Sequence, residues 1–107
     1  MVIGVPKEIK NNENRVSILP FGVEDLSKFG HKVIIQSQAG CGSGFTDDDY
    51  KRAGAKIINS SESIFQQSDL IIKVKEPQPE EIQMIRKNQI IFTYFHFAAN
   101  ENLTKSD

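Results

Sequence analysis

Five short apolar runs, separated by segments with helix or turn signals, constrain the fold of this chain more than any other feature. The runs have the length and the Val, Ile and Phe content of β-strands: Val2–Val5, Lys32–Gln36, Lys56–Ile58, Leu70–Val74 and Gln89–Ala99. Strands that alternate with helices at this spacing need right-handed crossovers, which produce a parallel sheet. The pattern therefore predicts an α/β fold.

Four segments between these runs carry helix boundary signals. Pro20 suits the first turn of a helix, and Thr46 with Asp49 forms a potential capping box. The helices are predicted from Pro20 to Gly30, from Thr46 to Gly54, from Asn59 or Ser60 through Phe65, and from Glu80 to Ile85. We expect a single domain over residues 1–107, with the parallel sheet flanked by helices in a three-layer, flavodoxin- or Rossmann-like arrangement. The pattern leaves the strand order open.

Composition excludes several classes of protein. With 38% hydrophobic and 25% charged residues and a net charge of −1, the chain is globular and offers no basic surface for nucleic acid or an anionic membrane. No apolar run approaches the roughly 20 residues that span a bilayer. Cys41 is the only cysteine, so an intrachain disulfide is impossible, and we expect a cytoplasmic protein.

The run Gln89–Ala99 contains the most informative single residue. Its β-branched and aromatic residues predict a fully buried strand, and His96 stands where that strand should end. In open α/β sheets, ligands bind beyond the carboxyl ends of the strands. His96 is thus a candidate acid/base, with a satisfied core histidine as the competing interpretation. Tyr94 would share its side of the strand.

Two further basic residues follow predicted strands. Arg15 lies on the polar loop after the first strand and Lys75 at the end of the fourth. Arginine can grip a carboxylate with two parallel hydrogen bonds, lysine can polarise a carbonyl, and histidine can transfer protons near neutral pH. Together they suit a small carboxylate. Taken alone, Arg15 is more often a solvated loop residue and Lys75 is evenly balanced, while Lys73 is expected to be structural or solvent-reaching.

Two other features suggest chemistry that the residues do not support. The loop Gly40–Gly44 follows a strand, but the G-x-G-x-x-G fingerprint of dinucleotide sites fails at Phe45, so we interpret the loop as a turn needing unusual φ angles. His31, His96 and Cys41 make a poor ligand set, and no metal is expected. Cys41 is expected to be an inert thiol.

Several sequence blocks resemble bacterial alanine dehydrogenases at their N-terminus. The blocks occur in one order along nearly the whole chain: Ile3–Glu8, Asn11–Val16, Ala39–Phe45, Leu70–Pro77 and Phe92–Ala99. The related nicotinamide nucleotide transhydrogenases share the opening block and the glycine loop. They do not keep the lysine and the histidine that stand here as Lys75 and His96, so this chain looks like a dehydrogenase.

The resemblance implies a reaction and roles for the candidate residues. L-Alanine, NAD and water would give pyruvate, ammonium and NADH. Arg15 would grip the substrate carboxylate, Lys75 would polarise the C2 oxygen of pyruvate, and His96 would be the general acid/base. Tyr94 would line the pocket, and Glu8 and Lys7 would support the loop without direct roles.

The family also implies parts that this sequence does not contain. Its members are about three times as long and bind NAD in a separate Rossmann domain, so residues 1–107 would be a truncated substrate domain, inactive alone, of an enzyme that forms homo-oligomers. Two alternatives stay open: a non-catalytic remnant that binds an oxo acid or assists assembly, and the N-terminal domain of a transhydrogenase alpha-type subunit.

Overall fold

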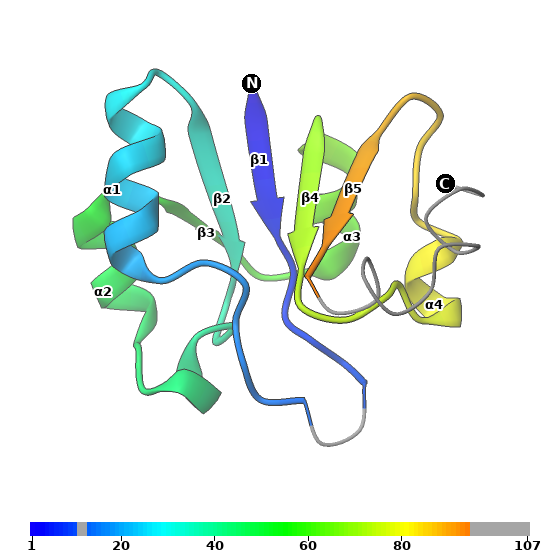
Figure 1. Cartoon of the computed structure of the whole chain (residues 1–107), viewed down its shortest axis with the longest axis horizontal. Coiled ribbons are helices and arrows are strands. Elements are labelled where there is room, and N and C mark those ends of the chain that lie inside the picture. The colour runs from blue at the N-terminus through cyan, green and yellow to red at the C-terminus, as the bar shows by residue number, and fades with distance from the viewer. Residues whose placement is uncertain (11–12, 95–107) are drawn as a thin grey trace.

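All five strands of the sheet run parallel, in the order β3-β2-β1-β4-β5 (Figure 1). The structure is a computed structural model and describes residues 1–10 and 13–94. The elements are β1 (Val2–Val5), α1 (Pro20–Lys28), β2 (Lys32–Gln36), the 3₁₀-helix η1 (Cys41–Ser43), α2 (Asp47–Ala53), β3 (Lys56–Ile58), α3 (Ser61–Gln67), β4 (Leu70–Lys73), α4 (Pro79–Ile82) and β5 (Ile90–Thr93). The predicted α/β fold with a parallel sheet is confirmed.

The strand order places a switch point between β1 and β4. From β1 the chain proceeds outward to β2 and β3, and then returns to β1's other side, where β4 pairs through Ile3 with Leu70 and Gly4 with Ile71. The connections that follow β1 and β4 lead to α1 and α4 on opposite faces of the sheet, and open α/β sheets bind ligands at the carboxyl edge of such a switch point. The order that the sequence left open thus identifies one candidate edge.

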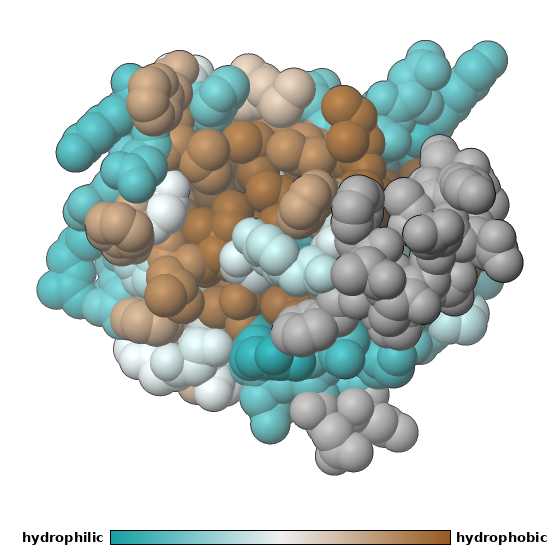
Figure 2. All heavy atoms as spheres, in the orientation of Figure 1, coloured by the Kyte–Doolittle hydropathy of each residue, from teal (hydrophilic) through white to brown (hydrophobic). Residues whose placement is uncertain are grey.

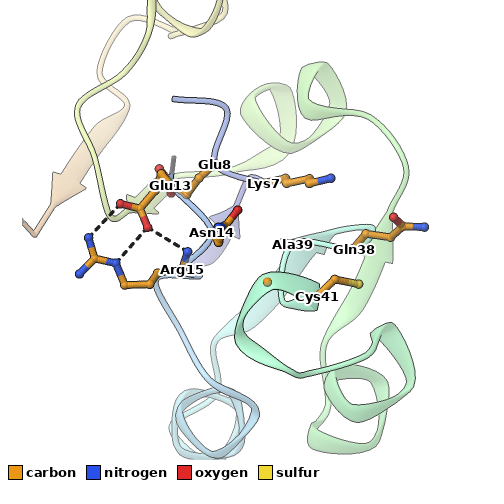
Figure 3. A pocket seen from close by; sticks show the side chains of 9 residues that line it. Lys7, Glu8, Glu13, Asn14, Arg15, Gln38, Ala39 and Cys41 are labelled. Atoms are coloured by element: carbon orange, nitrogen blue, oxygen red, sulfur yellow. Dashed lines mark hydrogen bonds and ion pairs between the residues drawn. The ribbon is translucent and has the colours of Figure 1, made fainter. Parts of the chain in front are cut away.

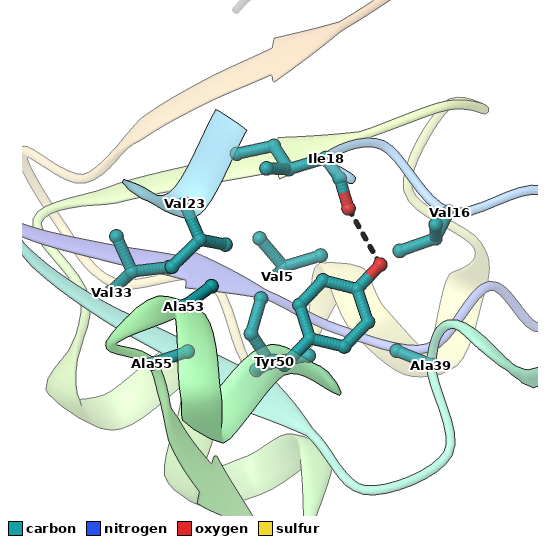
Figure 4. Close-up of a cluster of buried hydrophobic side chains, with 10 residues drawn as sticks. Val5, Val16, Ile18, Val23, Val33, Ala39, Tyr50, Ala53 and Ala55 are labelled. Carbon is teal, nitrogen blue, oxygen red and sulfur yellow. Dashed lines mark hydrogen bonds between the residues drawn. The ribbon is translucent and has the colours of Figure 1, made fainter. Parts of the chain in front are cut away.

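Helices cover both faces of the sheet and enclose two apolar clusters. Helices α1 and α2 contact β2 and β3, and the cluster between them and the sheet includes Val5, Val23 and Tyr50 (Figure 4). The Tyr50 hydroxyl is buried and donates a 2.7 Å hydrogen bond to the carbonyl of Ile18. Helix α3 packs Phe65 on the opposite face. The three-layer arrangement follows from these two clusters.

The predicted helix boundaries of α1 and α2 are confirmed. Pro20 occupies the first turn of α1, and Gly30 follows its end with a φ of +88°. At α2 the Thr46 hydroxyl accepts from the Asp49 N–H, while the Asp49 carboxylate accepts from the Thr46 N–H. Gly54 ends this helix at a φ of +111°, a conformation that strains any residue with a Cβ.

The prediction of a fully buried fifth strand is wrong for the described residues. β5 is short, pairs only with β4 within the described sheet, and leaves Ile90 54% and Phe92 45% exposed. The registers Leu70–Ile90 and Ile72–Phe92 place these side chains on the face where α1 and α2 cover β2 and β3. Figure 2 shows apolar residues gathered on this side of the molecule. Hydrophobicity predicted the strand, but its edge position decides its burial.

Helix α4 is shorter than the predicted range of Glu80 to Ile85. It ends at Ile82 because the N–H groups of Met84 and Ile85 bond to carbonyls three residues back, as in a turn. Within the described ranges, no helix is both long and apolar enough to cross a membrane.

Candidate functional site

The loop after β1 is fastened to the end of β4 at three places. The Ser17 hydroxyl donates to the Ile72 carbonyl at 2.8 Å, and the Lys10 ammonium pairs with the Glu76 carboxylate. The third connection is the carboxylate of Glu8. These contacts cross the switch point, so they fix the segment that carries Arg15 against the segment that carries Lys75.

Glu8 provides the most extensive of these connections. Its Oε1 accepts from the Lys73 ammonium at 3.0 Å and from the Lys75 N–H at 3.3 Å, and its Oε2 accepts from the Val74 N–H at 3.0 Å. The Glu8 side chain is only 2% exposed. A carboxylate removed from water needs such donors, because an unpaired buried charge is costly.

Lys73 completes a buried ionic cluster with two carboxylates. Its ammonium lies 3.0 Å from Glu8 Oε1 and 3.0 Å from Glu81 Oε2, and all three side chains are at most 2% exposed. The structural role expected for Lys73 is confirmed, whereas the solvent-reaching alternative is wrong. The Lys73 side chain points to the face opposite Ile72, where α4 supplies Glu81.

Arg15 is bound by the neighbouring carboxylate of Glu13 (Figure 3). Its Nε and Nη2 donate to Glu13 Oε2 and Oε1 at 3.0 and 2.9 Å, and the Arg15 backbone N–H donates to Oε2 at 2.9 Å. The Glu13 side chain is 3% exposed and that of Arg15 56%. The hydrogen bond from the Arg15 side chain lowers the pKa of Glu13, and the same hydrogen bond raises the pKa of Arg15.

A pocket of about 200 Å³ opens beside this pair. Its lining comes from the loops after β1 and β2: Lys7, Glu8, Glu13, Asn14, Arg15, Gln38, Ala39, Cys41 and Gly42. The two loops approach so closely that a Cβ on Gly42 would lie 2.2 Å from the Asn14 carbonyl oxygen. Glycine at position 42 is therefore required by contact with the segment that carries Arg15.

The structure brings three of the four predicted site residues to the carboxyl edge of the sheet. Arg15 and Lys75 follow β1 and β4, and the positive charge of Lys75 contributes to the lowered pKa of Glu13. Tyr94 directly follows β5 and donates its N–H to the Lys73 carbonyl at 3.2 Å. Its ring is edge-on to Phe92, with centroids 5.3 Å apart. His96 lies outside the described residues.

The glycine loop has a geometry that does not suit a dinucleotide. Gly44 has a φ of +88°, as the predicted unusual turn requires, and η1 occupies the middle of the loop. The following helix α2 carries Asp47, Asp48 and Asp49 in its first turn. Three carboxylates there oppose the negative charge of a pyrophosphate. The glycine loop and the start of α2 therefore do not fit a pyrophosphate.

Sequence reasoning missed the buried acids of the site. The loop after the first strand is rich in charged and amide residues, a composition typical of exposed segments, yet the side chains of Glu8 and Glu13 are buried. A signal was present in the fourth strand, where Lys73 interrupts an apolar run. A lysine at a buried strand position needs a carboxylate partner, so Lys73 indicates that at least one acid elsewhere in the chain is buried beside it.

Comparison with known proteins defines the family. The family model described as "Alanine dehydrogenase/PNT, N-terminal domain" matches residues 4–106. The chain belongs to this family. An alanine dehydrogenase of Methanococcus maripaludis is 52% identical over 106 residues, which are 99% of this chain and 28% of the relative. The chain thus spans little more than a quarter of the length of the curated relatives that it matches.

Solved structures give the same fold for two enzymes of the family. A structure of an L-alanine dehydrogenase matches with a TM-score of 0.87 and 48% identity, covering 97% of this chain and 28% of that one. A transhydrogenase from Sinorhizobium meliloti matches with a TM-score of 0.86 and 27% identity, covering 99% of this chain and 30% of that one. The fold is shared equally, so the higher sequence identity is what favours the dehydrogenase.

Proposed function

We propose that this chain is the substrate-binding N-terminal part of an NAD-dependent L-alanine dehydrogenase, which converts L-alanine to pyruvate and ammonium. The observation that carries the proposal is the position of Arg15 and Lys75, which follow the two strands on either side of the switch point. Two cations at the carboxyl edge suit a 2-oxo acid, which has a carboxylate beside a polarisable carbonyl.

Each residue of the proposed site has a distinct task. Arg15 binds the substrate carboxylate, and Lys75 donates to the C2 oxygen of pyruvate and polarises its carbonyl. His96 transfers protons as water and ammonia add to or leave C2, a contribution typically worth ~10²–10⁴ in rate. Tyr94 would flank the substrate on the β5 side; it is not among the residues that line the pocket of about 200 Å³ beside Arg15. Arg15 donates its Nε and Nη2 to the carboxylate of Glu13, which holds the guanidinium beside the pocket.

The remaining parts of the reaction belong outside these residues. We place NAD in a separate dinucleotide-binding domain, because the glycine loop here does not fit it. Residues 1–107 then form the substrate domain, which is inactive alone, of a cytoplasmic homo-oligomeric enzyme. Mixing the pure chain with pyruvate, ammonium and NADH tests this division. Steady oxidation of NADH by the chain alone would contradict it.

Two other functions are compatible with the same fold. A binding or assembly module would keep the pocket without chemistry, and a transhydrogenase domain would not use a lysine and a histidine for an oxo acid. The presence of Lys75 and His96 disfavours the second of these. Pyruvate binding that needs Lys75 would separate a retained substrate site from a purely structural remnant.

Calorimetric titration of pyruvate into the chain tests the proposed site. Loss of a hydrogen bond to a charged group costs about 1.5–3 kcal/mol, so we expect Arg15→Ala and Lys75→Ala each to weaken binding by roughly 10- to 100-fold. Arg52→Ala is the matched control, since the Arg52 side chain is 75% exposed and pairs with Asp49 on α2. Pyruvate affinity that survives Arg15→Ala unchanged would exclude the proposed carboxylate site.

A further inference from the structure

We propose that Glu8 is a positioning residue for Lys75 and so sets the affinity of the chain for a 2-oxo acid. This inference rests on the proposed function and deepens it, because Glu8 is not assigned any contact with substrate. Its carboxylate is buried at the carboxyl edge of the sheet and accepts hydrogen bonds from the backbone of Val74 and Lys75. Lys75 is the lysine that the substrate would contact.

Glu8 makes three hydrogen bonds to the end of β4 and the residues that follow it. One carboxylate joins the ammonium of Lys73 to the N–H groups of Val74 and Lys75, immediately after the last residue of β4. These two N–H groups lie beyond the sheet ladder, where a parallel strand no longer supplies partners. Glu8 therefore replaces the missing ladder and determines the path of the backbone at Lys75.

The backbone at Lys75 is fixed by contacts at Lys75 itself and at the next residue. Glu8 binds its N–H, and Lys10 from the same loop pairs with the next residue, Glu76. Glu8 also acts on the other cation, because its negative charge contributes to raising the pKa of Arg15. A single residue therefore influences both cations of the proposed site. A displacement of about 1 Å at a reacting group is enough to impair a site substantially.

Glu81 provides the contrast that separates positioning from stability. It contributes the second carboxylate to Lys73 at the same 3.0 Å distance, and its side chain is equally buried. Its contacts are with Lys73 and, through Oε1, with the N–H of Gln78 at the start of α4. Within the described residues, Glu81 Oε2 accepts no hydrogen bond, whereas Glu8 Oε1 accepts one from Lys73. A role limited to the buried ammonium would therefore affect global stability alone, whereas a positioning role would change the Val74 and Lys75 amides selectively.

The experiment compares Glu8→Gln with Glu81→Gln in the whole 107-residue chain. Two readouts are measured under conditions where both variants are folded: the pyruvate dissociation constant, and the hydrogen exchange of the Val74 and Lys75 amides. Glutamine keeps the shape of Glu8 but replaces one acceptor oxygen by a donor. We expect Glu8→Gln to weaken pyruvate binding by about tenfold or more and to accelerate exchange at Lys75. Glu81→Gln should leave pyruvate affinity within about twofold, and any faster exchange that it causes should follow the loss of global stability rather than be confined to the Val74 and Lys75 amides.

The outcomes distinguish this inference from the proposed function. If the wild-type chain binds pyruvate and the two variants weaken binding equally, or not at all, the positioning role is overturned while the proposed function stands. If the wild-type chain does not bind pyruvate, the proposed function fails and the substrate role of Glu8 fails with it. If Glu8→Gln does not fold, Glu8→Asp keeps the charge and is measured in its place: weaker pyruvate binding with faster exchange at Lys75 would support the positioning role, and wild-type affinity would overturn it.

Discussion

Substitution of Lys73 by methionine tests the buried ionic cluster most severely. The change keeps an unbranched side chain at a position that is 1% exposed, but it leaves the carboxylates of Glu8 and Glu81 without the ammonium that lies 3.0 Å from each. Removing one partner from a buried ion pair costs about 3–5 kcal/mol. Because domains of this size are stable by only ~5–15 kcal/mol, the variant should approach the limit of folding.

Urea unfolding followed by circular dichroism measures this loss. For a slope of about 1–3 kcal/mol per molar urea, a loss of 3 kcal/mol or more lowers the midpoint by roughly 1 M or more. Lys56→Met is the matched control, because Lys56 is an exposed lysine in β3 and its replacement should change stability by no more than about 0.5 kcal/mol.

A second substitution shows whether unpaired carboxylates cause the loss. In Lys73→Met combined with Glu81→Gln, one of the two stranded charges is removed, so the double variant should be less destabilised than the sum of the single variants. Equal midpoints for Lys73→Met and Lys56→Met would refute the reasoning. They would mean that the buried ammonium contributes no net stability to its partners.

Three further perturbations probe other parts of the structure. Gly42→Ala should lower both stability and pyruvate affinity, because the new Cβ would lie 2.2 Å from the Asn14 carbonyl oxygen. Gly30→Ala is the control, since it strains only the backbone φ; similar pyruvate affinities for the two variants would contradict the prediction. The hydrogen bond from Arg15 lowers the pKa of Glu13 below 4.5, so its stabilisation is present above that pH and is lost as the pH falls through the folded pKa. Glu13→Gln should therefore flatten the acid limb of stability in acid titration, and an unchanged limb would contradict the ion pair. Burial raises the pKa of Tyr50 to about 12, so ultraviolet titration should show its ionisation only near that pH, and Tyr50→Phe should cost about 1–1.5 kcal/mol in urea unfolding.

The layers and most element boundaries could be predicted because local chemistry determines them. Proline at position 20 and the reciprocal bonds of Thr46 and Asp49 act within a few residues, so sequence reveals them. Strand order depends on contacts between residues far apart in the chain. The strand order places β5 at an edge of the described sheet, and this edge position leaves Phe92 exposed.

The candidate site was predictable in part for the same reason. Arg15 and Lys75 could be placed because the carboxyl ends of parallel strands share an edge. The cluster of Glu8, Lys73 and Glu81 joins residues separated by up to 73 positions, and polar residues on a loop give no local sign of burial. Only the lysine inside an apolar strand indicated that a partner was needed.

A 2-oxo acid would bind beside the segments that follow β1 and β4, at the carboxyl edge of the sheet. Titration of the isotopically labelled chain with pyruvate, followed residue by residue by NMR, tests this binding site most directly. We predict saturable shifts at Arg15, Lys75 and His96, with the resonances of α3 unchanged. Shifts confined to other surfaces, or no shifts at Arg15 and Lys75 at millimolar pyruvate, would contradict the account.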